Sequence, residues 1–212
     1  MATPTHFEEA RAAARRGMGA LWAARVRGVN VDARRVSAVR CWATLGPPSW
    51  TPTMDASVAG EADAVKNLIA VGAALDLQST NGFTALMLAA QYGKTAVAVA
   101  LIGAGAALDV QGDHGWTALL FAAHHGHAAI VNALIDAGAA LDLQNDQGCA
   151  AIMAAARFGR AAVATALIEA GAALYLQDRG GRTAIAHAAE RGHIDIATAL
   201  VGAGVHALAL CG

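Results

Sequence analysis

The sequence predicts an all-α solenoid, built from helix-turn-helix units with short hairpin-like turns and a period of 33 residues. Three columns of glycines, meaning positions that recur at this step, support the prediction. The columns are Gly82, Gly115, Gly148 and Gly181; Gly60, Gly93, Gly126, Gly159 and Gly192; and Gly72, Gly105, Gly138, Gly171 and Gly204. Three columns that keep one phase over five units are not expected by chance, so each stretch of 33 residues is interpreted as one structural unit.

Each unit is expected to hold two short helices. In the unit that starts at Gly82, the first helix follows Thr84, carries Leu86 and the alanine pair 89–90 on one apolar face, and is broken by Gly93. The second helix carries Val97 and Leu101, and the glycine at 105 suits a left-handed residue at its end. The predicted units are 49–81, 82–114, 115–147, 148–180 and 181–212. No unit can bury its apolar face alone, so neighbours must stack into one continuous solenoid domain.

Upstream of these units the pattern weakens. Residues 1–37 are interpreted as a tail and a degenerate capping repeat, and 38–50 as an insertion loop. The loop contains Trp42 and Trp50, and two interpretations stay open: the loop is tucked onto the groove, or it is a finger that contacts a partner.

Composition excludes several classes of protein. The 212 residues are 56% hydrophobic and 15% charged, whereas a typical soluble chain has about 25% charged residues, so intrinsic disorder is excluded. The longest uncharged run, 196–212, contains His206 and three glycines and repeats a pattern found upstream, so no membrane span is expected. The cysteines Cys41, Cys149 and Cys211 form no CxxC pair, which favours a reducing compartment: the cytoplasm, with the nucleus as the alternative.

A net charge of −1 argues against a globally basic nucleic-acid binder, and no nucleic-acid partner is expected. Residues 1–40 are basic, with eight arginines against three acidic residues. We interpret these arginines as the polar outer face that a terminal repeat needs.

The units resemble the ankyrin repeat family, whose pattern runs G-x-T-P-L-H-x-A-A, then G-H, a second helix and G-A. Thr84-Ala85-Leu86 and Thr117-Ala118-Leu119 match the T-P-L segment with alanine for proline, and Thr183 begins a third match. His127 and His193 match the G-H histidine. The resemblance implies a non-catalytic protein that binds other proteins.

Positions that differ between units are free of the demands of stacking. In ankyrin repeats they form the concave face and the tips of the turns, so the resemblance implies that they contact a partner. The candidate partner-binding residues are Phe83, Tyr92, His114, Trp116, His124, His125, Arg157, Phe158, Arg182 and Arg191. Aromatic residues and arginine are enriched at binding hot spots. Because one end of the stripe is apolar and the other cationic, a partner with a hydrophobic anchor and an acidic segment is expected.

No motif in the chain predicts catalysis, a cofactor or a metal site. Gly93-Lys94-Thr95 ends like a phosphate-binding loop, but Leu88 stands where that motif needs a glycine. His124 and His125 point about 100° apart on a helix, so they cannot join His127 around one ion. The recurring Asp76, Asp109 and Asp142 are interpreted as turn caps.

The function predicted from the sequence is a non-catalytic scaffold or adaptor for protein–protein interaction. The last second helix, which begins at Ile194, is nearly all apolar, so self-association or partner docking is expected there. The alternative is a regulatory or targeting fragment of a larger multidomain protein, whose catalytic part would lie outside this chain.

Overall fold

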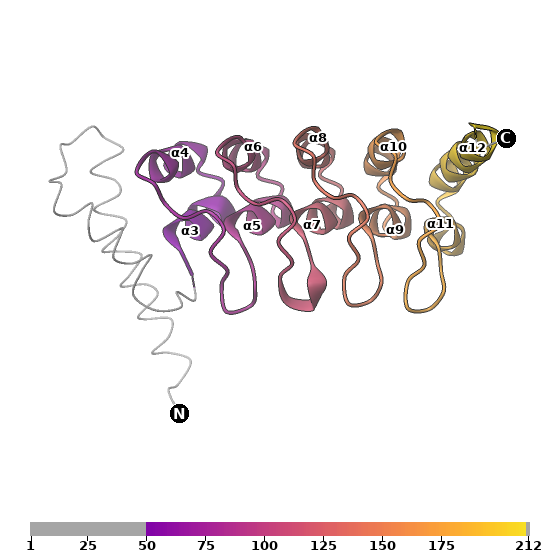
Figure 1. The fold of residues 1–212 in the computed structure, drawn as a ribbon, viewed down its shortest axis with the longest axis horizontal. Helices are drawn as coiled ribbons and strands as arrows, with labels where there is room; N and C mark the ends of the chain where they lie inside the picture. The colour runs from indigo at the N-terminus through magenta and orange to yellow at the C-terminus, as the bar shows by residue number, and fades with distance from the viewer. Residues whose placement is uncertain (1–49, 211–212) are drawn as a thin grey trace, which may run out of the picture. The chain divides into compact units, whose positions relative to one another are not determined.

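A computed structural model describes residues 50–210 of the protein, with side chains described as far as Gly204. Within this range the chain forms five successive helix pairs and one short 3-10 turn, without a strand. The pairs are α3 (Pro52–Ala59) with α4 (Ala62–Ala70), α5 (Ala85–Gln91) with α6 (Thr95–Gly103), α7 (Ala118–His125) with α8 (Ala128–Asp136), α9 (Ala151–Arg157) with α10 (Ala161–Glu169), and α11 (Ala184–Arg191) with α12 (Ile194–Leu210). Figure 1 shows the first helices of the pairs in one row and the second helices in another, with the loops between pairs extending past the first row. The predicted all-α repeat architecture is confirmed.

Threonine caps start most of the first-row helices. Thr84 lies in extended backbone before α5, and its hydroxyl accepts a hydrogen bond from the Met87 amide at 3.2 Å. The same bond recurs at Thr51, Thr117 and Thr183. Ala150 occupies this position before α9 and provides no side-chain cap. These caps satisfy amides that the first turn of a helix leaves free, which defines where each helix begins.

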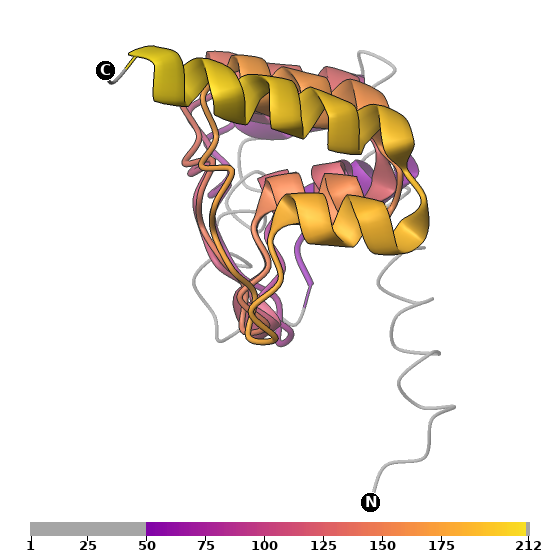
Figure 2. The ribbon, with the colours of Figure 1, turned by 90° about the vertical axis from the view of Figure 1, so that its right-hand side faces the viewer.

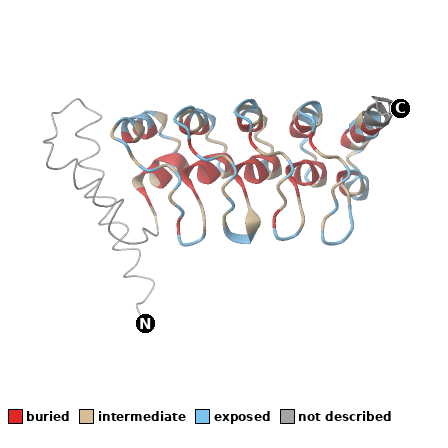
Figure 3. Cartoon of the chain, viewed as in Figure 1, coloured by how far each residue is buried: buried red, intermediate tan, exposed pale blue. Residues whose placement is uncertain are grey.

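The three middle helices of the first row, α5, α7 and α9, are buried on nearly all sides. The predicted apolar face of α5 was limited to Leu86 and the alanine pair, but every residue from Ala85 to Ala90 is buried. Helix α5 contacts α3 and α7 within its row and α6 in the second row. Packing against three helices therefore needs apolar side chains on more than one face of α5. Figure 3 shows this buried row beside the more exposed second row. Small alanines allow the close approach, because a larger side chain would separate the helices.

One glycine column marks the contact between successive repeats. A Cβ atom added at Gly93 would lie 2.5 Å from Cε1 of His127, which belongs to the following repeat. Gly60, Gly126 and Gly159 are covered in the same way by Lys94, Arg160 and His193. The histidine of the G-H motif therefore has a stacking role, and lysine or arginine can substitute for it.

Two ladders of polar side chains connect the repeats. Asp76 Oδ1 accepts a hydrogen bond from the Ala107 amide at 2.8 Å, and Asp109 and Asp142 accept from residues equally far ahead. These aspartates were expected to act as turn caps, and each of them caps backbone just after a turn in the next repeat. In the second ladder, Gln78 donates to the carbonyl oxygen of Gln111 at 3.0 Å, and Gln111 and Gln144 repeat the bond.

The two ends of the described stack differ from its middle. Helices α4, α6, α8 and α10 have 9 residues each, whereas α12 has 17 and runs through Gly204 without the left-handed turn of the other glycines in its column. At the other end, the Trp50 indole donates to Asp55 Oδ1 at 2.6 Å, which ties this residue to α3. The predicted segment 1–37 and the rest of the insertion loop lie outside the described residues, as do Cys41 and Cys211. Among residues 50–210, no helix combines the length and the apolar character needed to cross a bilayer.

Candidate functional site

Five rings from three successive repeats form a continuous row, which we call the aromatic row. Its members are Phe83, Phe121, Trp116, His124 and Phe158. The ring of Phe121 stacks between Phe83, at 5.3 Å between centroids, and Trp116, at 4.8 Å. His124 then meets the edge of Trp116 at 5.6 Å and the ring of Phe158 at 4.1 Å. Such offset and edge contacts are the arrangements that aromatic pairs prefer.

Local structure explains how these rings meet. Phe121 and His124 are one turn apart on α7, so they share a face of the helix. Trp116 follows the 3-10 turn Asp113–Gly115 directly before α7, and its indole folds back onto that face. Phe83 occupies the equivalent position before α5, and Phe158 follows the last turn of α9. The row is partly exposed: Phe158 is 40% exposed and Phe121 only 9%.

Basic side chains gather beside one end of the row. We call His125, His127, Arg157 and Arg160 the basic cluster. The Arg157 guanidinium lies 5.6 Å from the centre of the Phe158 ring, within the range of a cation–π contact. Arg160 Nε donates to the His124 carbonyl oxygen at 3.1 Å. Within residues 50–204, neither arginine forms an ion pair with a carboxylate, so the positive charges of Arg157 and Arg160 are not compensated.

The two histidines of α7 respond to this environment. Burial lowers the pKa of His124, and the nearby charges of His125, Arg160 and Arg157 lower it further. Burial also lowers the pKa of His125, together with His127 and Arg160. Both rings are therefore neutral at neutral pH. Nδ1 of His124 is buried and has no hydrogen-bond partner among the described residues, which leaves a polar atom unsatisfied next to Phe158.

Six of the ten predicted partner-binding residues come together here: Phe83, Trp116, His124, His125, Arg157 and Phe158. The structure does not bring the other four into the row. Tyr92 is 51% exposed at the end of α5, and Arg191 is exposed at the end of α11. His114 lies at a loop tip with a φ of 59°, and its Nδ1 is 3.8 Å from Asp146.

Sequence reasoning missed Phe121 and underestimated Arg160. Phe121 occupies a column that holds Leu88, Ala154 and His187 in the other units, so its aromatic character was a usable signal. Arg160 belongs to the G-H column and was explained by the repeat alone. Its structural role over Gly126 and its place in the basic cluster are compatible, because the aliphatic part covers the glycine and Nε reaches the His124 carbonyl oxygen.

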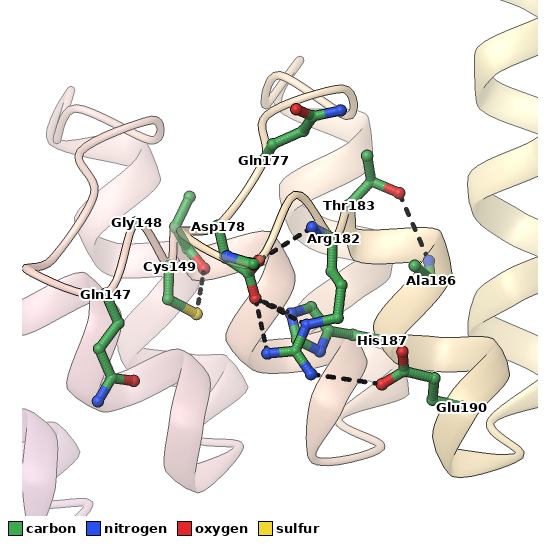
Figure 4. A network of polar contacts seen from close by, with 12 residues as sticks. Gln147, Gly148, Cys149, Gln177, Asp178, Arg182, Thr183, Ala186, His187 and Glu190 are labelled. Atoms are coloured by element: carbon green, nitrogen blue, oxygen red, sulfur yellow. Dashed lines mark hydrogen bonds and ion pairs between the residues drawn. The ribbon is translucent and has the colours of Figure 1, made fainter.

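A second polar group lies farther along, in the loop before α11 (Figure 4). The Asp178 carboxylate accepts from the Arg182 amide and the Gly180 amide at 2.9 and 2.8 Å, and its other oxygen lies 2.9 Å from Nε2 of the buried His187. The hydrogen bond from the Arg182 backbone amide is the largest cause that lowers the pKa of Asp178 to about 2. Hydrogen bonds from the Arg182 guanidinium and from His187 lower this pKa further, whereas burial acts in the opposite direction. Arg182, a predicted binding residue, is thus held by Asp178 at 3.0 Å and by Glu190 at 3.6 Å.

This network is suited to holding a loop. Cys149 is the nearby thiol, and burial raises its pKa, which keeps the sulfur protonated. A nucleophilic cysteine needs the opposite shift. The described residues contain no group of three or more histidine, cysteine or acidic side chains placed to hold a metal ion. The Asp178 network instead stabilises the last loop, while the aromatic row presents the larger partly exposed surface.

Comparison with known families agrees with this architecture. The family model for ankyrin repeats (3 copies) matches residues 53–145 and 130–209, which together cover more than half of the chain. The chain belongs to the ankyrin repeat family. Ankyrin repeats are generally modules for protein–protein interaction, and the fold is typically non-catalytic. No curated protein matches the chain.

Proposed function

We propose that this ankyrin repeat protein is a non-catalytic scaffold or adaptor that binds a partner protein along the aromatic row and the basic cluster. The observation that carries the proposal is the contact of five rings from three repeats with cations that have no acidic partner. Such a surface has a cost in the free protein, since a buried polar atom of His124 stays unsatisfied.

The chemistry of the surface defines the kind of partner. Half-buried rings such as Trp116 and Phe158 favour an apolar anchor, because they lose little side-chain entropy when they are covered. The uncompensated charge of Arg157 and Arg160 favours a carboxylate next to that anchor. The proposed partner is therefore a protein segment with a hydrophobic anchor followed by acidic residues. Tyr92, His114, Arg182 and Arg191 remain proposed contacts at the edges of this surface.

Truncation of Trp116 is expected to weaken partner binding strongly. The indole contacts both Phe121 and His124, so Trp116→Ala opens the middle of the row and should cost about 2 kcal/mol of binding free energy. Peptides would first be selected from a random display library on the full chain. Their dissociation constants for wild type and variant would then be measured by fluorescence anisotropy.

Tyr175→Ala is the matched control, since Tyr175 is an aromatic residue that is 65% exposed and makes no ring contact with the row. It should leave affinity unchanged. Selected peptides without acidic residues, or peptides that bind Trp116→Ala as tightly as wild type, would refute the proposed surface.

Binding of an acidic peptide is also expected to tighten as pH falls from about 7.5 to about 5.5. The pKa values of His124 and His125 are lowered in the free protein, so both rings are neutral at the upper end of this range. A bound carboxylate favours the charged rings and raises these pKa values, so binding takes up protons and strengthens with acidity. The affinity of one selected peptide would be measured across the range. The double variant His124→Gln/His125→Gln should give a flat profile, and a flat wild-type profile would contradict the prediction.

We also propose a cytoplasmic location, supported by Cys149, a free cysteine among the described residues. The division of the chain into a capping repeat, an insertion loop and units that begin at 49, 82, 115, 148 and 181 is likewise a proposal. It is supported by the positive φ values of Gly82, Gly115, Gly148 and Gly181.

A further inference from the structure

The surface at the last repeat is apolar and open. Figure 2 looks onto the final pair and shows α11 and α12 in front of the other helices. Between them lies a hollow of about 460 Å³, whose lining includes Ala189, Gly192, Ile194 and Val201. Ile194 is 74% exposed and Val201 51% exposed. Contiguous apolar surface marks interaction sites on soluble proteins when the patch is large.

In every earlier repeat, the next helix pair covers the equivalent surface. Ile185 is 38% exposed, whereas its equivalents Ile152 and Leu119 are 0% and 2% exposed. Gly159 is covered by the His193 ring, but no described atom lies within 4 Å of a Cβ built at Gly192. Within the described residues, the repeat of α11 and α12 therefore presents a stacking surface that lacks a cover, and the residues of this surface are apolar.

The backbone after this surface does not lead into another stacked repeat in the usual way. Each earlier second helix ends near a glycine with positive φ, from which the chain turns into the next loop. In α12 the equivalent Gly204 stays helical, and Tyr175 donates from its hydroxyl to the Gly204 carbonyl oxygen at 3.4 Å. The connection that would place a following repeat on α11 and α12 is thus replaced by a continuous helix.

Charges beside the hollow favour a second copy of the same surface. Arg191 and Asp195 flank the lining residues Gly192 and Ile194, both are exposed, and neither forms an ion pair within the described residues. In a two-fold contact the same surface serves both partners, so Arg191 of one copy can meet Asp195 of the other, and the reverse. One surface then provides an apolar centre and both members of the ion pair.

We propose that two copies of this chain associate through the α11–α12 surface, with the hollow as the apolar centre and Arg191 and Asp195 as reciprocal ion pairs. The interface contains no ring of the aromatic row, so each dimer would present two aromatic rows to partners, while Arg191 would serve the dimer contact and not the partner. Two linked surfaces raise the avidity for a partner that carries two binding segments.

The test is sedimentation equilibrium of the full chain from about 1 µM to about 200 µM. Wild type should show a concentration-dependent monomer–dimer equilibrium. Val201→Glu places an unpaired charge in the apolar centre and should raise the dimer dissociation constant at least ~tenfold. Val99→Glu is the matched control, because Val99 is also 51% exposed but lies on α6, and it should leave the equilibrium unchanged.

Charge variants test the two-fold arrangement itself. Arg191→Asp should weaken the dimer, and Arg191→Asp combined with Asp195→Arg should restore it. Circular dichroism melting would check that each variant stays folded, which is expected because the changed side chains are exposed. A wild type that stays monomeric at every concentration would overturn the proposal. So would a dimer that Val201→Glu leaves intact, or a charge reversal that does not rescue association.

Discussion

Replacement of Gly82 by alanine should lower the free energy of unfolding by about 3 kcal/mol, a large part of the stability of a small domain. Gly82 has a φ of 69°, and an L-residue in this left-handed region costs about 1–2 kcal/mol. A Cβ atom there would also lie 2.6 Å from the Asp113 amide nitrogen and 2.8 Å from Gly112 Cα. Both are backbone atoms of the next loop, so no side-chain rotation can relieve the clash.

Gly105→Ala separates the two causes. Gly105 has a φ of 81°, but nothing lies within 4 Å of the added Cβ atom, so only the backbone cost of about 1 kcal/mol should remain. Urea denaturation of wild type and both variants, followed by circular dichroism, gives the comparison. Equal losses for the two variants would mean that the loops are not held against each other as described.

Truncation of Ile152 should cost about 3 kcal/mol of stability, within the range of about 2–5 kcal/mol found for buried isoleucine. Ile152 lies in α9 and is 0% exposed. Neighbouring repeats contact α9 on both sides of its row, so the cavity left by Ile152→Ala cannot collapse easily.

The same substitution one repeat later provides the control. Ile185 occupies the equivalent position in α11 but is 38% exposed, so Ile185→Ala should cost only about 1 kcal/mol. Thermal unfolding at about 1 µM keeps the proposed dimer dissociated and measures the monomer. If the two variants lose the same stability, α11 is covered in solution by something other than a weakly associating second copy.

Much of the candidate site could be predicted from the sequence, because variable positions in a repeat are visible by comparison between units. Trp116 and Phe158 were singled out in this way, and the structure brings them into contact with His124. Phe121 was missed although its column varies between units, with Leu88, Ala154 and His187 at the equivalent positions. Arg182 was identified by the same comparison, but its partner Asp178 holds it within the loop.

The 33-residue period was visible in the sequence alone, as a repeat of the same residues at a fixed step. The helix pairs and the left-handed glycine at 105 could also be predicted from the sequence, since each depends on residues within a few positions of one another. Only the tertiary structure decided how one repeat lies on the next. That geometry buries α5 on all sides, directs Asp76 to the amide of Ala107, and leaves the α11–α12 surface without a cover. The physical reason is that local patterns define which residue occupies each position, whereas contacts between positions about 33 apart depend on the distance and rotation between whole helix pairs.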